Sequence, residues 1–196
     1  MDNWSVTAPE TPRVGFYPAC GLDVQESAAI LAPFVDRILF CDIDRRRVPD
    51  WNRLKRTLPP GPAVDFKCCD ARAALVGIPR ISVAFHRKDS QGEGGSALSI
   101  LRGRLAGTIL DRFPAEGGLF ITDGSNLWGK QLKRLTRASG VPVHLADGIA
   151  AIGELGYKQL RLARGVATHR WRLRPAPDQT LLELHGLWII TATKEG

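Results

Sequence analysis

The residues that could hold an anionic or electron-rich ligand lie near the start of the chain, where an apolar run ends. The run Val14-Gly-Phe-Tyr17 leads into the small residues Pro18-Ala-Cys-Gly21, and Asp23-Val-Gln-Glu26 then opens a helical pattern. This order predicts a strand, a tight turn and a helix that begins with Asp23 and Glu26 as a capping box. The free N–H groups and the positive dipole end of such a helix suit an anionic or electron-rich ligand.

Gly21 and Asp23 each have two interpretations. A glycine in this turn lets the backbone approach a ligand closely, or it lets the strand and the helix pack against each other. Asp23 is interpreted first as the helix cap and second as a direct ligand contact, and the two roles are compatible.

Three more carboxylates follow apolar runs further along the chain. Asp42 comes directly after Ile38-Leu-Phe-Cys41, about 20 residues beyond the turn, where a carboxylate can accept hydrogen bonds from ribose hydroxyls in a βαβ nucleotide-binding unit. Asp44 competes for this role, and both side chains could instead pair with the arginines at 45–47. Asp70 either meets a ligand or caps a short helix that follows it.

The stretch from His86 to Ser96 combines an imidazole, cations, carboxylates, hydroxyls and glycines. We expect it to lie over the crevice where open α/β sheets bind ligands. His86 is predicted to be a general base because its unperturbed pKa lies near neutrality, and Asp89 could orient it or take the proton itself. The alternative is a surface turn in which Ser96 caps the next helix.

Polar residues around this stretch are candidates for substrate binding. Arg87 and Ser90 belong to the stretch itself, and Asp123 and Asn126 follow the next apolar run. Asp123 and Asn126 could complete a polar site with Asp89, or they could form a turn and a helix cap.

The apolar runs alternate with helical patterns over most of the chain. Strands are expected at 13–17, 37–41, 63–68, 80–85 and 119–122, and helices at 24–34, 50–58, 71–76, 97–113 and 128–138. Strand-like alternation follows at 141–145, 157–163 and 169–174 and within 181–193. The pattern predicts an α/β fold, a mostly parallel sheet with antiparallel C-terminal strands and helices on both faces. We expect an N-terminal arm at 1–12 and a single domain at 13–196.

Composition limits the classes of protein that fit. The chain has 196 residues, of which 44% are hydrophobic and 24% charged, and it holds no apolar run of the roughly 20 residues that a membrane helix needs. The four cysteines lack metal-ligand spacing, so we expect reduced thiols, no metal site and a cytoplasmic protein. The net charge of +7 makes nucleic acid a possible partner, although solvated basic faces explain it as well. The oligomeric state stays open.

In order and spacing, residues 13–175 resemble the class I S-adenosylmethionine-dependent methyltransferases, which have a Rossmann-like fold. Tyr17-Pro-Ala-Cys-Gly-Leu-Asp23 stands where that superfamily has its glycine-rich turn, and Asp42 stands where its acidic residue holds the ribose. Cys69-Asp70-Ala71 stands where an acidic side chain meets the adenine amino group, and Phe85-His-Arg-Lys-Asp89 where substrate and catalytic groups lie. The resemblance implies S-adenosylmethionine as cofactor, with contacts from Tyr17, Ala19, Gly21, Asp23, Asp42 and Asp70.

The turn departs from the superfamily pattern. Tyr17 stands near the usual acidic position, Ala19 is not glycine, and Asp23 replaces the last glycine. The loop after Phe85 also lacks the Asn-Pro-Pro-Tyr or Asp-Pro-Pro-Tyr signature of amino-methylating enzymes. The resemblance therefore implies a methyltransferase-like protein whose methyl acceptor is unknown.

A second interpretation is a catalytically inactive Rossmann-like module that binds nucleic acid or a protein partner through its basic faces. A nicotinamide-dependent dehydrogenase fits less well, because the turn lacks the GxGxxG spacing.

Overall fold

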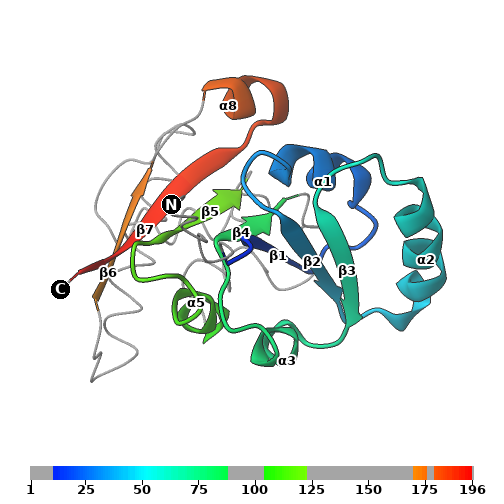
Figure 1. Cartoon of the computed structure of the whole chain (residues 1–196), viewed down its shortest axis with the longest axis horizontal. Helices are drawn as coiled ribbons and strands as arrows, with labels where there is room; N and C mark the ends of the chain where they lie inside the picture. Colours follow the sequence, from blue (N-terminus) through cyan, green and yellow to red (C-terminus); the bar gives the residue numbers. More distant parts are fainter. Residues whose placement is uncertain (1–10, 88–103, 123–169, 176–178, 196) are drawn as a thin grey trace, which may run out of the picture.

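The fold is built on one seven-stranded sheet with the strand order β3-β2-β1-β4-β5-β7-β6. It is seen in a computed structural model that describes residues 11–87, 104–122, 170–175 and 179–195 (Figure 1). The strands are β1 (Val14–Pro18), β2 (Arg37–Asp42), β3 (Ala63–Cys68), β4 (Val83–His86), β5 (Gly118–Thr122), β6 (Arg170–Pro175) and β7 (Trp188–Glu195).

Strand direction follows the expected pattern. β1 to β5 pair in parallel, and β7 runs antiparallel both to β5 and to β6. β7 is therefore the reversed strand, and β6 runs in the same direction as β1 to β5. Five parallel strands bring their carboxyl ends to one edge of the sheet, and in open α/β sheets that edge is where ligands bind.

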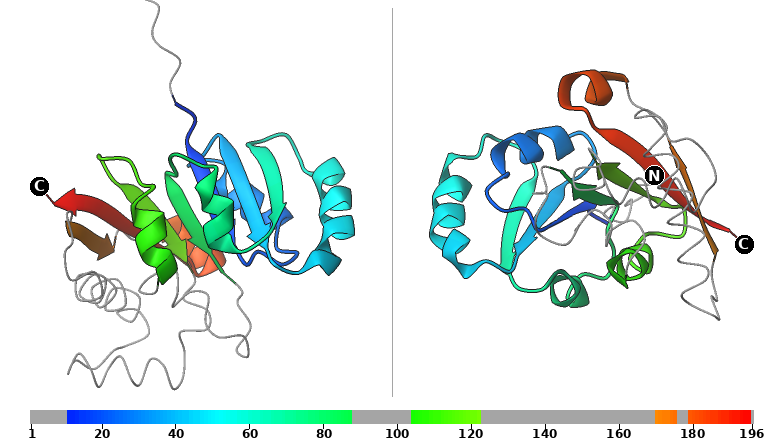
Figure 2. Two further views of the ribbon diagram at one scale, coloured as in Figure 1. Left: turned by 90° about the horizontal axis from the view of Figure 1, so that it is seen from below. Right: turned by 180° about the vertical axis from the view of Figure 1, so that it is seen from behind.

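Helices cover both faces of the sheet, as predicted. They are α1 (Gln25–Leu31), α2 (Val48–Thr57) after a 3₁₀ turn, η1 (Arg45–Arg47), then α3 (Ala71–Val76), α5 (Arg104–Leu110) and α8 (Gln179–His185). α1 and α8 lie over one face, with α2 flanking β3, and α3 and α5 lie over the other face (Figures 1 and 2).

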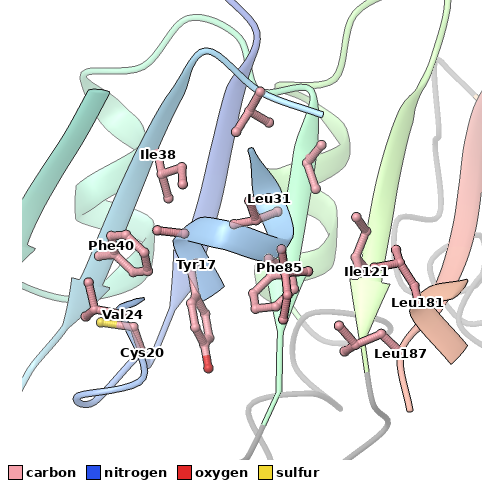
Figure 3. Packing of buried hydrophobic residues seen from close by; sticks show 14 of the residues in the cluster. Tyr17, Cys20, Val24, Leu31, Ile38, Phe40, Phe85, Ile121, Leu181 and Leu187 are labelled. Carbon is pink, nitrogen blue, oxygen red and sulfur yellow. The ribbon is translucent and has the colours of Figure 1, made fainter. Parts of the chain in front are cut away.

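Each face carries its own apolar cluster, because successive side chains of a strand point to opposite sides. Under α3 and α5 the cluster includes Phe16, Leu39 and Phe120. Under α1, α2 and α8 it includes Phe40 and Phe85 (Figure 3). The fold class predicted from the sequence is thus confirmed.

Several boundaries differ from the sequence prediction. α2 begins at Val48, because Pro49 occupies its first turn, where a missing N–H costs nothing, and does not interrupt the helix. α8 precedes β7 in a stretch where only a strand was expected. The elements expected at 97–103, 128–138, 141–145 and 157–163 lie outside the described residues. The single-domain assignment stays a prediction.

Candidate functional site

The turn after β1 lies at the carboxyl edge of the sheet and has two residues in the left-handed backbone region. Ala19 has φ 55° and Gly21 has φ 54°. The Gly21 N–H donates to Oδ2 of Asp42 at 2.8 Å, and the Gly21 carbonyl accepts from Nε1 of Trp51 at 2.8 Å. The two peptide groups that flank the Cα of Gly21 are therefore fixed, one to the end of β2 and the other to α2.

The backbone conformation, and not crowding, explains the glycine at position 21. A Cβ built on Gly21 would meet no described atom within 4 Å, so close packing of strand and helix is not the reason for a glycine here. The positive φ favours glycine because it has no side chain to clash with the backbone. A side chain is thus absent at a residue whose N–H binds the Asp42 carboxylate.

Asp42 is held in a defined orientation. Oδ2 accepts the Gly21 N–H, and Oδ1 accepts the N–H of Asp44 at 2.9 Å. The side chain is half-buried, and a carboxylate oxygen can accept more than one hydrogen bond. Asp42 therefore presents pre-positioned acceptors at the carboxyl end of β2.

Asp44 has a structural role. Its carboxylate caps η1 by accepting from the Arg46 N–H at 3.1 Å, and it pairs with the side chains of Arg46 and Arg47. The hydrogen bond from the Arg46 side chain holds the pKa of Asp44 below its usual range. Of the two carboxylates that compete for the ribose role, Asp42 is the one that borders the Gly21 turn.

Asp70 caps α3, as one of the two interpretations expected. Its carboxylate accepts from the Arg72 N–H at 2.9 Å and pairs with the Arg72 side chain. These contacts, the backbone N–H first, hold the pKa of Asp70 below its usual range. A contact to adenine stays a prediction for this residue.

The capping box predicted at Asp23 and Glu26 is wrong. α1 has no side-chain cap, because both carboxylates turn to the buried guanidinium of Arg87. Asp23 accepts from Nε and Nη2 of Arg87, each at 2.6 Å, and Glu26 accepts from Nη2 at 2.6 Å. The Arg87 side chain is only 3% exposed, and a charge so deeply buried requires opposite charges at hydrogen-bond distance.

Tyr17 and Ser27 complete this group, which we call the Arg87 cluster (Tyr17, Asp23, Glu26, Ser27 and Arg87). The Tyr17 hydroxyl lies 2.8 Å from the Arg87 carbonyl and 3.1 Å from Oδ2 of Asp23, and the Ser27 hydroxyl donates to the same Oδ2 at 2.8 Å. The Tyr17 ring packs edge-on against Phe85, with its hydroxyl directed out of the apolar cluster (Figure 3). The hydroxyl thus joins the turn after β1 to the end of β4.

Burial and charge fix the protonation states of this cluster. Burial, and then the nearby Asp23 carboxylate, raise the pKa of Tyr17, so the phenol stays neutral. Burial alone would lower the pKa of Arg87, but the hydrogen bonds to Asp23 and Glu26 outweigh it and raise the pKa. Arg87 therefore stays charged.

His86 is the last residue of β4, at the start of the stretch for which we predicted catalytic groups. It is 2% exposed, and in register it faces Thr122 of β5, which is also buried. Its role as a general base stays a prediction, as does a substrate contact from Arg87, whose guanidinium lies inside the Arg87 cluster. Asp89, Ser90, Asp123 and Asn126 lie outside the described residues.

Two exposed apolar residues beside Asp42 were missed from the sequence. Leu22 follows the turn and is 43% exposed, and Ile43 follows Asp42 and is 72% exposed. A ligand that covers such side chains removes apolar surface from water, which is favourable. Their types are visible in the sequence, but their exposure becomes known only with the backbone in place.

No protein-family model and no curated protein matches the sequence. Among solved structures, the fibrillarin/Nop5p complex matches with a TM-score of 0.50 at 10% identity, over 93% of this chain and 73% of that chain. The likeness is one of fold, a mostly parallel Rossmann-like sheet with helices on both faces. The plantazolicin methyltransferase BpumL in complex with S-adenosylhomocysteine gives a TM-score of 0.48 at 10% identity, over 94% and 77% of the two chains. Spermidine synthase from Thermotoga maritima gives 0.45 at 13%, over 95% and 55%.

Three further features are seen in the part of the chain that the structure describes. No three side chains of His, Cys, Asp or Glu gather there as a metal site. Its helices are too short or too polar to cross a membrane. The four cysteines carry free thiols.

Replacing Arg87 with methionine tests the buried charge. Arg87→Met leaves the largely buried Asp23 without its cation, so we expect a loss of about 3 kcal/mol in the free energy of unfolding, measured by urea denaturation. Arg80→Met is the matched control, because it removes an exposed ion pair with Glu116 and should cost about 1 kcal/mol or less. Adding Asp23→Asn to Arg87→Met should recover about 1 kcal/mol or more. If the losses in the free energy of unfolding from the two substitutions were strictly additive, the interaction between Asp23 and Arg87 would be contradicted.

Replacing Ala19 with glycine tests the backbone of the turn. A non-glycine residue at φ 55° carries a steric cost of about 1 kcal/mol, so Ala19→Gly should raise the free energy of unfolding by about that amount. Ala28→Gly, in the buried face of α1, is the control and should lower it, because glycine weakens a helix interior. A lower thermal midpoint for Ala19→Gly would show that the turn does not depend on this conformation.

Proposed function

We propose that this chain binds S-adenosylmethionine at the carboxyl ends of β1 and β2 and transfers its methyl group to an acceptor of unidentified class. One observation carries the proposal. Gly21 has a left-handed conformation with no described atom within 4 Å of its side-chain position, and its N–H is one of the two backbone N–H groups that hold the Asp42 carboxylate in place. A backbone without a side chain next to a fixed acceptor suits a nucleoside with ribose hydroxyls.

The surroundings of Asp42 suit the rest of a nucleoside. Leu22 follows Gly21, Ile43 follows Asp42, and both expose apolar surface. An adenine ring would cover such surface favourably. Asp70, one strand further along the sheet edge, is the proposed contact for the adenine amino group. Ala19 borders the turn and would approach the cofactor through its backbone.

The bound cofactor supplies an activated methyl group on its sulfonium, so the protein needs to supply mainly approach and alignment. In this proposal the Arg87 cluster, with Tyr17 and Asp23, fixes the turn that receives the cofactor. His86 acts as the base for acceptors that must lose a proton, and Asp89 orients it. Ser90, Asp123 and Asn126 are the proposed contacts to the acceptor. The guanidinium of Arg87 is not counted among them, because it is 3% exposed and bound to Asp23 and Glu26.

A second candidate function, a basic module without catalysis, is favoured by the charges of one segment. η1 and α2 carry six cations against the two carboxylates of Asp44 and Asp50, at the same edge of the sheet; the cations are Arg45, Arg46, Arg47, Arg53, Lys55 and Arg56. Such a surface suits phosphates of a nucleic acid. A cytoplasmic location is also proposed, because thiols stay free in reducing compartments.

Calorimetric titration of Asp42 variants with S-adenosylmethionine and S-adenosylhomocysteine tests the leading proposal. We expect a micromolar dissociation constant for the unaltered protein, about −8 kcal/mol. Asp42→Asn should weaken both ligands about tenfold or more, because hydrogen bonds to a charged acceptor are lost. Asp36→Asn is the matched control, because Asp36 lies at the amino end of β2 and pairs with Arg13, so it should leave both affinities unchanged.

Two outcomes would count against the proposal. Equal affinities of Asp42→Asn and the unaltered protein would remove the ribose role of Asp42. The absence of heat with either ligand, from a folded sample, would reject cofactor binding and favour the basic module. In that case binding to duplex or single-stranded nucleic acid should fall steeply with salt.

A further inference from the structure

A cavity of about 490 Å³ lies at the amino ends of β1 and β2 and along residues 65–67 of β3, on the sheet face that α3 covers. Its presence follows from the lengths of the elements. α3 has six residues, about 9 Å of helix, whereas the six residues of β3 extend over about 20 Å. α3 starts at the carboxyl end of β3 and therefore leaves the amino half of this face uncovered.

The floor and one wall of the cavity are apolar. Val14 of β1 and Leu39 of β2 contribute to the floor, and Ile78 and Pro79, from the segment after α3, contribute to a wall. Val14, Leu39 and Ile78 belong to the apolar cluster under α3 and α5. A flat apolar group placed here would extend the core of the protein.

The charged residues around the cavity are mostly cations. Arg37, Lys67 and Arg80 line it together with one carboxylate, Asp65. Asp65 pairs with Arg37, and Arg80 pairs with Glu116, which is not among the lining residues. The lining therefore carries a net charge of +2.

Lys67 is the cation best placed to bind a ligand. Its side chain leaves β3 on the same face as Asp65, and its Nζ donates to the carbonyl of Ala74 at 3.2 Å, near the end of α3. An ammonium has three N–H donors. The Ala74 carbonyl uses one of them, and no carboxylate of the described chain pairs with Lys67, so donors remain for an anion.

We infer that this cavity is a second binding site, for a small organic anion that combines a flat apolar body with one carboxylate or similar group. The volume is in the usual range for small-molecule sites, about 300 to 1,000 Å³. The apolar body would cover Val14, Leu39 and Ile78, and the anionic group would accept from Lys67. The site does not depend on the proposed function, because neither Gly21 nor Asp42 lines the cavity.

The test is a titration of the full chain with 2-naphthoate, compared with the neutral 2-naphthalenemethanol, in low salt at pH 7. We expect saturable binding of the acid at one site, about tenfold tighter than the alcohol, because only the acid forms a charge-assisted hydrogen bond with Lys67. Lys67→Met should reduce the affinity for the acid to that for the alcohol, and Lys67→Arg should retain most of it. Lys55→Met, on the exposed face of α2, is the matched control and should change neither.

Saturating S-adenosylhomocysteine should leave the naphthoate affinity unchanged. Displacement by it would place naphthoate at the carboxyl edge and overturn the inference. Equal affinities for acid and alcohol, unsaturable binding, or full affinity in a folded Lys67→Met protein would overturn it as well. If Lys67→Met does not fold, because Lys67 also binds the end of α3, two other measurements test the inference. They are the difference in affinity between the acid and the alcohol and the affinity of Lys67→Arg for the acid.

Discussion

The burial of one positive charge organises the carboxyl edge of this sheet. Arg87 leaves β4 at the centre of the sheet, and its guanidinium is removed from water under α1. Such a charge is tolerated only with opposite charges in good geometry, so Asp23 and Glu26 are drawn from the start of α1 to meet it. Tyr17 then joins the carboxylate of Asp23 to the main chain of Arg87. The turn after β1 and the exit of β4 are thereby tied together, and the candidate cofactor site is built on that connection.

The fold was largely predictable, because its signals are local. Apolar runs of strand length, separated by helical periodicity, predicted the parallel strands β1 to β5 with boundaries that differ from the structure by at most three residues. Turn residues indicated that the alternation of strands and helices changes near the C-terminus. Two local judgements failed for physical reasons. The helix expected at 50–58 begins two residues earlier, because Pro49 fits the first turn of a helix. α8 lies in an apolar stretch that also contains β7, where periodicity indicated a strand.

The site was predictable only in part. The positions of Asp42 and Gly21 at the carboxyl edge could be predicted because they depend on strand ends and turn length, which are visible in the sequence. The capping roles of Asp44 and Asp70 depend on Arg46 and Arg72, whose backbone N–H groups and side chains both bind these carboxylates. Asp23 was misjudged because its partner, Arg87, lies 64 residues away, and a local capping pattern carries no information about a buried cation arriving from another strand. The exposure of Ile43 could not be predicted from the sequence either.

The reversed strand has a consequence for how the chain is made. β5 ends at Thr122, yet its antiparallel partner is β7, which begins at Trp188. β6 is synthesised before β7 and, among the described strands, pairs with β7 alone, so this pairing forms only after β7 has been made. Until β7 has been synthesised, β5 therefore lacks its antiparallel partner among the described strands, and such an edge is a template for mispairing with another nascent chain. The demand for protection by chaperones should be greatest between the synthesis of β5 and that of β7.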